Sequence, residues 1–186
     1  MSLERLTPPA ALPVSLTRAR EFLRVDDTLD DALLSDLVAA AARRIEQMTG
    51  LALITGQWRL WADCLPQDGL FRIPLAPVQS IDEVAVRTSS GWQVLDATLW
   101  QADTTSRPPR LRMVNPWPRP DGGLGAVRIT FTAGFGADDT AVPEELQLAV
   151  LTLAAHHYEF REGNIAARGM PPEVHSLLSG WRTLVL

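Results

Sequence analysis

Apolar residues recur at helical spacing in two stretches near the N-terminus. Ser15 is a suitable N-cap for a short helix over residues 16–25. The strongest helix is predicted over residues 29–50, where Thr28 serves as N-cap and Gly50 ends the helix. The apolar stripe that predicts this helix has spacings of three and four and consists of Leu29, Leu33, Leu37, Ala41, Ile45 and Met48.

Between residues 55 and 136 the apolar positions alternate instead, which is typical of strands. Residues 80–96 predict a hairpin that turns at Ser89–Ser90–Gly91, and the segments 98–103 and 109–114 could pair. Short strands joined by tight turns predict an antiparallel meander of about five or six strands rather than βαβ units. The side chains expected to share one face of a strand are Trp58, Leu60 and Ala62 in one segment and Val127, Ile129 and Phe131 in another.

A helical pattern returns at Pro143, a favourable first helical residue, and two glutamates follow in the first turn. This helix is predicted to extend to Gly163, and a linker over residues 163–172 leads to a last short helix with an apolar end. Residues 1–14 contain three prolines and predict an extended arm. We therefore expect an α+β fold with an N-terminal arm (1–14), a helical scaffold from both chain ends (15–54 and 137–186) and an inserted antiparallel β lobe (55–136).

Composition narrows the classes of function. The formal net charge is -5, which makes the chain a poor candidate for coating DNA or an anionic membrane, because phosphate binding depends on clustered lysine and arginine. No run approaches the roughly 18 apolar residues of a membrane span, and the N-terminus lacks the apolar core of a signal peptide. The single cysteine, Cys64, excludes a disulfide within the chain and suits a reducing compartment. We expect a soluble protein made in the cytoplasm.

Residues 151–163 contain His156 and His157 side by side, with Glu159 and Glu162 close behind. These residue types build metal sites and acid–base catalysts. A zinc site of the HExxH kind needs histidines four positions apart on a helix, whereas adjacent helical residues diverge by about 100°. His157 belongs instead to an apolar stripe with Leu146, Val150, Leu153 and Phe160. We expect no catalytic residue, metal or cofactor, and a metal-dependent hydrolase using His156, His157 and Glu159 remains as an alternative.

Tryptophans and arginines gather in the predicted β lobe. The lobe is too small to bury all of its tryptophans, so one or two of them are expected to be interface anchors. An arginine cluster beside a proline-rich loop suggests a second alternative, a DNA-packaging or DNA-binding accessory protein. That cluster consists of Arg107, Arg110, Arg112 and Arg119.

Three stretches of the chain carry a resemblance to a known family. In residues 13–58 a helix ending in LRVD precedes a long alanine-rich helix, and residues 73–84 form a strand with a proline-containing turn. Residues 127–163 combine a strand, a GFG exit and a long helix that ends in HHYEFRE. In this order the segments resemble the head–tail connector (adaptor, head-completion) proteins of tailed bacteriophages and of phage-like gene transfer agents. The likeness covers residues 13–185.

The resemblance implies a structural function without catalysis or cofactor. Members of this family form a ring beneath the portal protein, a dodecamer like the portal itself. The ring extends the channel through which double-stranded DNA passes, without sequence-specific binding, and a tail-side connector, stopper or tail-terminator protein docks below it. The implied location is the head–tail junction of a phage-like particle made in the bacterial cytoplasm, with no membrane partner.

The same resemblance directs attention to two sets of surface residues. The resemblance implies that the C-terminal segment of this chain contacts the portal. The residues expected at that contact are Val174, Leu177, Leu178, Trp181, Leu184, Val185 and Leu186. Contacts between neighbouring subunits of the ring are expected at Arg43, Arg44, His156, Glu159, Arg161 and Glu162. Deletion of residues 173–186 is predicted to leave a folded subunit that no longer associates with the portal.

Overall fold

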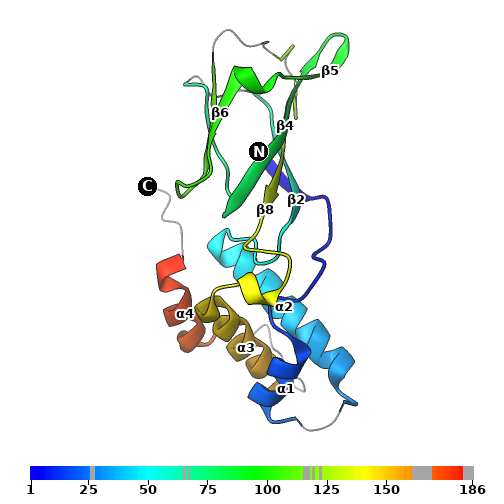
Figure 1. The fold of residues 1–186 in the computed structure, drawn as a ribbon, viewed down its shortest axis with the longest axis vertical. Coiled ribbons are helices and arrows are strands. Elements are labelled where there is room, and N and C mark those ends of the chain that lie inside the picture. The colour runs from blue at the N-terminus through cyan, green and yellow to red at the C-terminus, as the bar shows by residue number, and fades with distance from the viewer. Residues whose placement is uncertain are drawn as a thin grey trace. The chain divides into compact units, whose positions relative to one another are not determined.

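The structure is a computed structural model of the 186-residue chain. It describes residues 1–25, 28–64, 66, 68–114, 118, 120–121, 123–160 and 169–181. Helices and antiparallel sheets are both present, which confirms the predicted α+β class. The chain divides into two compact units, each built from two separate stretches of sequence (Figure 1). The β unit comprises Met1–Pro9 and Thr55–Gly134, and the helical unit comprises Ala10–Ile54 and Phe135–Leu186.

The helical unit is organised around α3, which contacts the other described α-helices of the unit. Ser15 caps the first helix as predicted, because its Oγ accepts a hydrogen bond from the N–H of Arg18 at 3.3 Å. Gly50 ends the second helix in the left-handed conformation, with a φ of 67°. The helices are α1 (Leu16–Leu23), α2 (Asp31–Thr49), α3 (Glu144–Glu159) and α4 (Pro172–Leu178), with short 3₁₀ turns at η2 (Asp139–Ala141) and η4 (Ser179–Trp181) (Figure 1).

The predicted apolar stripe of α2 is wrong over its N-terminal half. Leu29 is 85% exposed and Leu33 is 37% exposed, whereas the neighbouring Leu34 is fully buried. Two apolar stripes lie side by side on this helix, and each satisfies the spacing of three and four. Packing against α3 buries the stripe that begins at Leu34, one position after Leu33 of the predicted stripe. The buried residues of α2 are Leu34, Val38, Ala41, Ala42, Ile45 and Thr49.

The β unit contains two antiparallel sheets. In the larger sheet the strand order is β1-β2-β8-β4-β5, and in the smaller sheet it is β3-β7-β6. The larger sheet consists of β1 (Ser2–Arg5), β2 (Gly56–Ala62), β4 (Val78–Thr88), β5 (Gly91–Val94) and β8 (Val127–Ala133). The smaller sheet consists of β3 (Leu70–Arg72), β6 (Trp100–Asp103) and β7 (Arg110–Met113), and the short 3₁₀ turn η1 (Ala97–Leu99) precedes β6.

Several strand predictions are confirmed, but the order of the strands is not. β4 and β5 form the predicted hairpin, and β6 pairs with β7. The predicted meander is wrong because β8, the last strand in sequence, lies between β2 and β4. The N-terminal arm also contributes a strand, since β1 pairs with β2 and forms an edge of the larger sheet (Figure 1).

The buried faces of the strands follow the predicted alternation. The two sets of side chains expected to share a face are buried on β2 and β8, respectively. In β4 the register slips at two irregularities, one of them between Ile81 and Glu83, so apolar positions need not alternate strictly there. Fully buried side chains of the β unit include Leu60, Phe71, Val84, Leu111, Ile129 and Phe131. None of the helices in the described part of the chain has the length and hydropathy needed to cross a bilayer.

Candidate functional site

The end of α3 carries the histidine pair. The His156 ring centre lies 6.3 Å from that of His157 and 4.8 Å from that of Phe160. Partial burial lowers the pKa of His157 below its ordinary value, and the nearby His156 lowers it further. Tyr158 donates a hydrogen bond from Oη to Asp30 Oδ2 at 2.5 Å, which ties the end of α3 to the start of α2. This segment therefore has a packing function in the helical unit.

The geometry gives little support to the metal-dependent hydrolase alternative. Among the described residues, no group of three or more histidine, cysteine, aspartate or glutamate side chains is placed to hold a metal ion. His156 Nε2 is buried and has no hydrogen-bond partner in the described part of the chain, and Glu159 is exposed. Arg161 and Glu162, two of the expected subunit contacts, lie outside the described residues. Two further residues of that set of six, Arg43 and Arg44, are exposed on α2.

Three of the four described residues of the expected portal-contact segment pack or hydrogen-bond within the helical unit. Val174 and Leu178 have no exposed surface, and α4 contacts α3. Trp181 donates a hydrogen bond from Nε1 to Glu145 Oε2 at 2.9 Å, and its ring meets Phe135 edge-on at 5.9 Å. Leu177 is partly exposed. Leu184, Val185 and Leu186 lie outside the described residues.

These contacts change the expectation for truncation. Deleting residues 173–186 removes two fully buried side chains, and it uncovers the surface of α3 on which they pack. The truncated subunit is therefore expected to be destabilised, contrary to the earlier expectation that it stays folded. Deleting only residues 182–186 spares α4 and is the cleaner test of a portal contact.

A network of aromatic and charged side chains connects all five strands of the larger sheet. Trp61 and Trp92 meet edge-on with ring centres 5.7 Å apart, and Trp61 Nε1 donates to Glu4 Oε2 at 3.1 Å. The Arg128 guanidinium lies 4.8 Å from the centre of the Trp92 ring and forms a 2.7 Å ion pair with Glu83. Trp92 remains 39% exposed. The network makes this face amphipathic, a chemistry suited to protein contacts.

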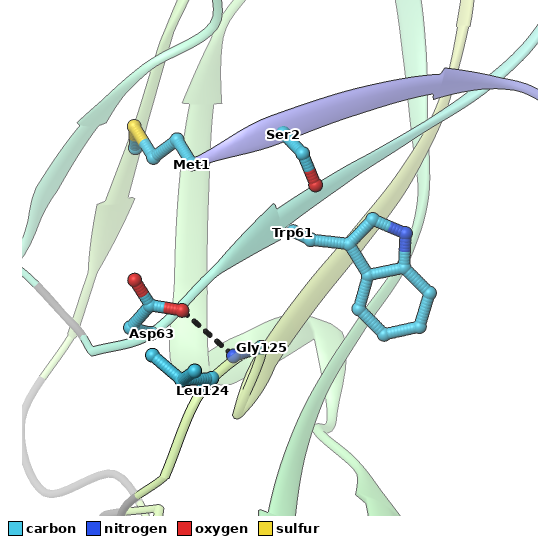
Figure 2. A pocket seen from close by; sticks show the side chains of 6 residues that line it. All are labelled: Met1, Ser2, Trp61, Asp63, Leu124 and Gly125. Carbon is cyan, nitrogen blue, oxygen red and sulfur yellow. Dashed lines mark hydrogen bonds between the residues drawn. The ribbon is translucent and has the colours of Figure 1, made fainter.

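An open hollow of about 540 Å³ adjoins this network (Figure 2). It lies where β1, β2 and the segment before β8 meet, and its lining includes Met1, Trp61 and Leu124. Asp63 Oδ1 accepts a hydrogen bond from the N–H of Gly125 at 2.7 Å (Figure 2). Among the described residues that line the hollow, Asp63 carries the one ionisable side chain.

The arginine cluster beside the proline-rich loop is partly neutralised. Arg110 forms a 2.5 Å ion pair with Asp103, and this guanidinium holds the pKa of the Asp103 carboxyl well below its ordinary value. Arg107 and Arg112 are exposed, and Arg119 lies outside the described residues. The described part of this cluster therefore keeps more basic than acidic side chains, and the Asp103 ion pair offsets the charge of one of them.

Comparison with known proteins identifies the same family that the sequence resembles. The family model described as "Phage gp6-like head-tail connector protein" matches residues 13–92. No curated protein matches the chain in sequence.

Three solved structures are similar to this chain along its whole length. One is a chain of the "Neck of empty GTA particle computed with C6 symmetry", with 31% identity, a TM-score of 0.84 and coverage of 100% of this chain and 97% of that chain. A chain of the "Virion of native gene transfer agent (GTA) particle" has 31% identity, a TM-score of 0.85 and the same coverage. A chain of the "Neck of native GTA particle computed with C12 symmetry" has 33% identity, a TM-score of 0.83 and again the same coverage.

Proposed function

The chain belongs to the phage gp6-like head–tail connector family, and from this premise we propose that it forms the ring that couples the portal to the tail. It is a structural connector subunit of the head–tail junction in a phage-like particle. In the proposed assembly the ring lies beneath the portal, surrounds the path of the DNA and offers its far side to a tail-side protein.

Similarity along the whole chain is the observation that carries this proposal. The match to the neck chain includes all of this chain and 97% of that chain, so both the β unit and the helical unit have counterparts there. That neck was computed with C12 symmetry, which supports a dodecamer for this chain as well. A closed ring of identical subunits requires head-to-tail contacts between two different surfaces of each subunit.

For the portal contact we propose the C-terminal end of the chain, with α4 as its base. Val174, Leu178 and Trp181 hold α4 within the helical unit and therefore position the segment that follows. The residues then proposed to contact the portal are Leu177, Leu184, Val185 and Leu186.

We further propose that the ring acts as a passive conduit without catalysis. Each subunit has a formal net charge of -5, so the ring as a whole offers the DNA phosphates no net positive charge to bind. A wall of like charge allows DNA to pass, whereas a basic wall holds it through phosphate contacts. The tail-side partner recognises the assembled ring rather than a reactive site.

Particles produced without this subunit test the proposal. We expect heads that carry no tails, and the wild-type subunit supplied separately is expected to restore them. Tailed particles formed in its absence contradict the proposed function. The variant that lacks residues 182–186 is expected to fold normally but to associate less with the portal, and unchanged association contradicts the proposed portal contact.

A further inference from the structure

One stripe of α2 remains exposed because the core of the helical unit does not bury it. This α2 outer stripe consists of Leu33, Leu37, Ala40 and Arg44, at spacings of four, three and four. Leu33 is 37% exposed, Arg44 is exposed, and the two residues between them are partly exposed. The stripe does not include any residue of the buried face of α2. Its chemistry is apolar along most of its length and basic at its C-terminal end.

A stripe of matching length runs along α3. This α3 outer stripe consists of Glu144, Leu148, Thr152 and Ala155. Leu148 is 40% exposed, and Glu144 is exposed at the N-terminal end. Thr152 Oγ1 donates a hydrogen bond to the carbonyl of Leu148 at 2.8 Å, so this hydroxyl needs no partner from outside the helix. The α3 stripe is therefore apolar or small along most of its length and acidic at its N-terminal end.

The packing inside one subunit determines how these helices meet in a ring. Tyr158 near the end of α3 bonds to Asp30 at the start of α2, and the N–H of Phe135, ahead of α3, donates to the carbonyl of Leu53, behind α2, at 3.3 Å. Within one subunit α2 and α3 are therefore antiparallel. One step of a twelve-fold ring turns the neighbouring copy by only about 30°. The α3 helix of the next subunit consequently runs nearly antiparallel to α2 of the first.

We propose that the α2 outer stripe of one subunit packs antiparallel against the α3 outer stripe of the next subunit, and that this contact closes the ring. The inference rests on the ring proposed above and names the two surfaces that form it. The buried faces of α2 and α3 are used within the subunit, which leaves the two outer stripes for other copies. They are two different surfaces of one unit, as a head-to-tail contact requires.

The two stripes match in length and in the order of large and small side chains. Leu33 to Arg44 and Glu144 to Ala155 are each separated by eleven residue steps, or about 16 Å of helix. When the helices are aligned antiparallel, Leu33 lies opposite Ala155, a large side chain against a small one. Alternation of large and small residues across a contact lets two helices approach closely.

The rest of the alignment follows the same rule. Leu148 lies opposite Ala40, again a large residue against a small one, and Leu37 lies opposite Thr152, whose hydroxyl is already satisfied. At the end of the contact Arg44 meets Glu144, so opposite charges complete the register. The contact thus buries the exposed leucines and pairs the charge at its end.

Charge reversal tests the contact. In either single variant, Arg44→Glu or Glu144→Arg, like charges meet in every contact of the ring. A weakening of roughly fivefold per contact is repeated around the ring, so we expect closed rings to be lost. The double variant restores opposite charges between identical copies and is expected to recover rings. Arg72→Glu is the matched control, because it makes the same charge change at an exposed position of β3, outside both stripes, and is expected to leave rings intact.

A disulfide test examines the geometry directly. Ala40→Cys is combined with Leu148→Cys in a Cys64→Ser background, because Cys64 is exposed. Oxidised rings are expected to give a ladder of covalent oligomers under denaturing conditions, since every subunit joins the next. Each variant with only one of the two cysteines is expected to give no ladder. Dimers without a ladder indicate a two-fold contact and overturn the proposal.

Ring formation is measured by native mass spectrometry on the full chain, alone and mixed with the portal ring. A wild-type chain that forms no ring under either condition overturns the proposed function, and the helix contact with it. Wild-type rings that persist in both single charge variants overturn the helix contact alone. Recovery in the double variant together with the disulfide ladder establishes it.

Discussion

Replacing Leu178 by alanine is expected to loosen α4 while α2 and α3 stay folded. Leu178 has no exposed surface, and neither does Val174, one turn earlier. α4 has only seven residues, whereas isolated helices shorter than roughly 12–15 residues are marginal in water. The stability of α4 therefore comes from its buried side chains and from the contacts of Trp181.

The size of the effect follows from this burial. Replacing a buried leucine by alanine costs about 2–5 kcal/mol, depending on how far the surroundings can relax. A short peripheral helix can shift into the space, so we expect the lower part of that range, about 2–3 kcal/mol. Since about 1.4 kcal/mol is a tenfold change in an equilibrium constant, α4 is expected to open roughly 30- to 150-fold more often.

Hydrogen exchange followed by mass spectrometry measures this opening. Backbone amides of residues 173–181 are expected to exchange faster in Leu178→Ala by that factor, while the amides of α2 and α3 keep their protection. The matched control is Leu177→Ala, which makes the same chemical change at a partly exposed position. Its effect is expected to stay below about tenfold, because less buried surface is lost.

Two results would refute this reasoning. Equal effects of the two leucine variants show that the burial of Leu178 does not hold α4 in place. Loss of protection throughout α2 and α3 shows that α4 is not a separable element. In that second case the proposed portal-contact segment cannot be altered without unfolding the helical unit.

Three further predictions address the remaining surfaces. A double-mutant cycle on Trp61→Ala and Trp92→Ala is expected to give a coupling of about 0.5–1.5 kcal/mol in urea unfolding, and no coupling contradicts the aromatic network. Burial lowers the pKa of His157, so the unfolded chain takes up the proton first as the pH falls through about 6.5. Stability is then full above that pH and lower at pH 5.5, and a His157→Gln variant with the same pH dependence contradicts this assignment. Metal analysis is expected to find no stoichiometric zinc or iron, and a metal lost on His156→Ala revives the hydrolase alternative.

Helical periodicity predicted the existence of α2 but not its buried face. Leu33 and Leu34 belong to adjacent apolar stripes, and each stripe repeats at spacings of three and four. Only the position of α3 decides which of them is buried, and that position depends on residues more than a hundred positions away. Leu33 and Leu37 of the predicted stripe belong to the surface that we propose for the neighbouring subunit, whereas Ala41 and Ile45 of the same predicted stripe are buried.

Alternation likewise predicted strands but not their neighbours. The side chains of β8 follow the same two-residue pattern whichever strand lies beside it, so local sequence carried no sign that β8 separates β2 from β4. The pairing of Trp61 with Trp92 depends on the same long-range order. The hairpin at Ser89–Ser90–Gly91 was predictable, because the conformation of a tight turn depends on the few adjacent residues that form it.

The histidine pair shows what helical geometry alone can predict about chemistry. Adjacent residues on a helix diverge by about 100°, which argues against a metal ion shared by His156 and His157. The contact of Tyr158 with Asp30 was not foreseen, because a hydrogen bond between distant segments leaves no local pattern. The arginine cluster was identified by composition alone, and the ion pair of Arg110 with Asp103 shows why counting like charges overstates a patch.

The most direct test of the central claim is a reconstruction by electron cryomicroscopy of this subunit bound to its portal, computed without imposed symmetry. A ring of twelve copies coaxial with the portal, with α4 on the portal side, is the predicted result. Copies bound singly, or arranged off the portal axis, contradict the account.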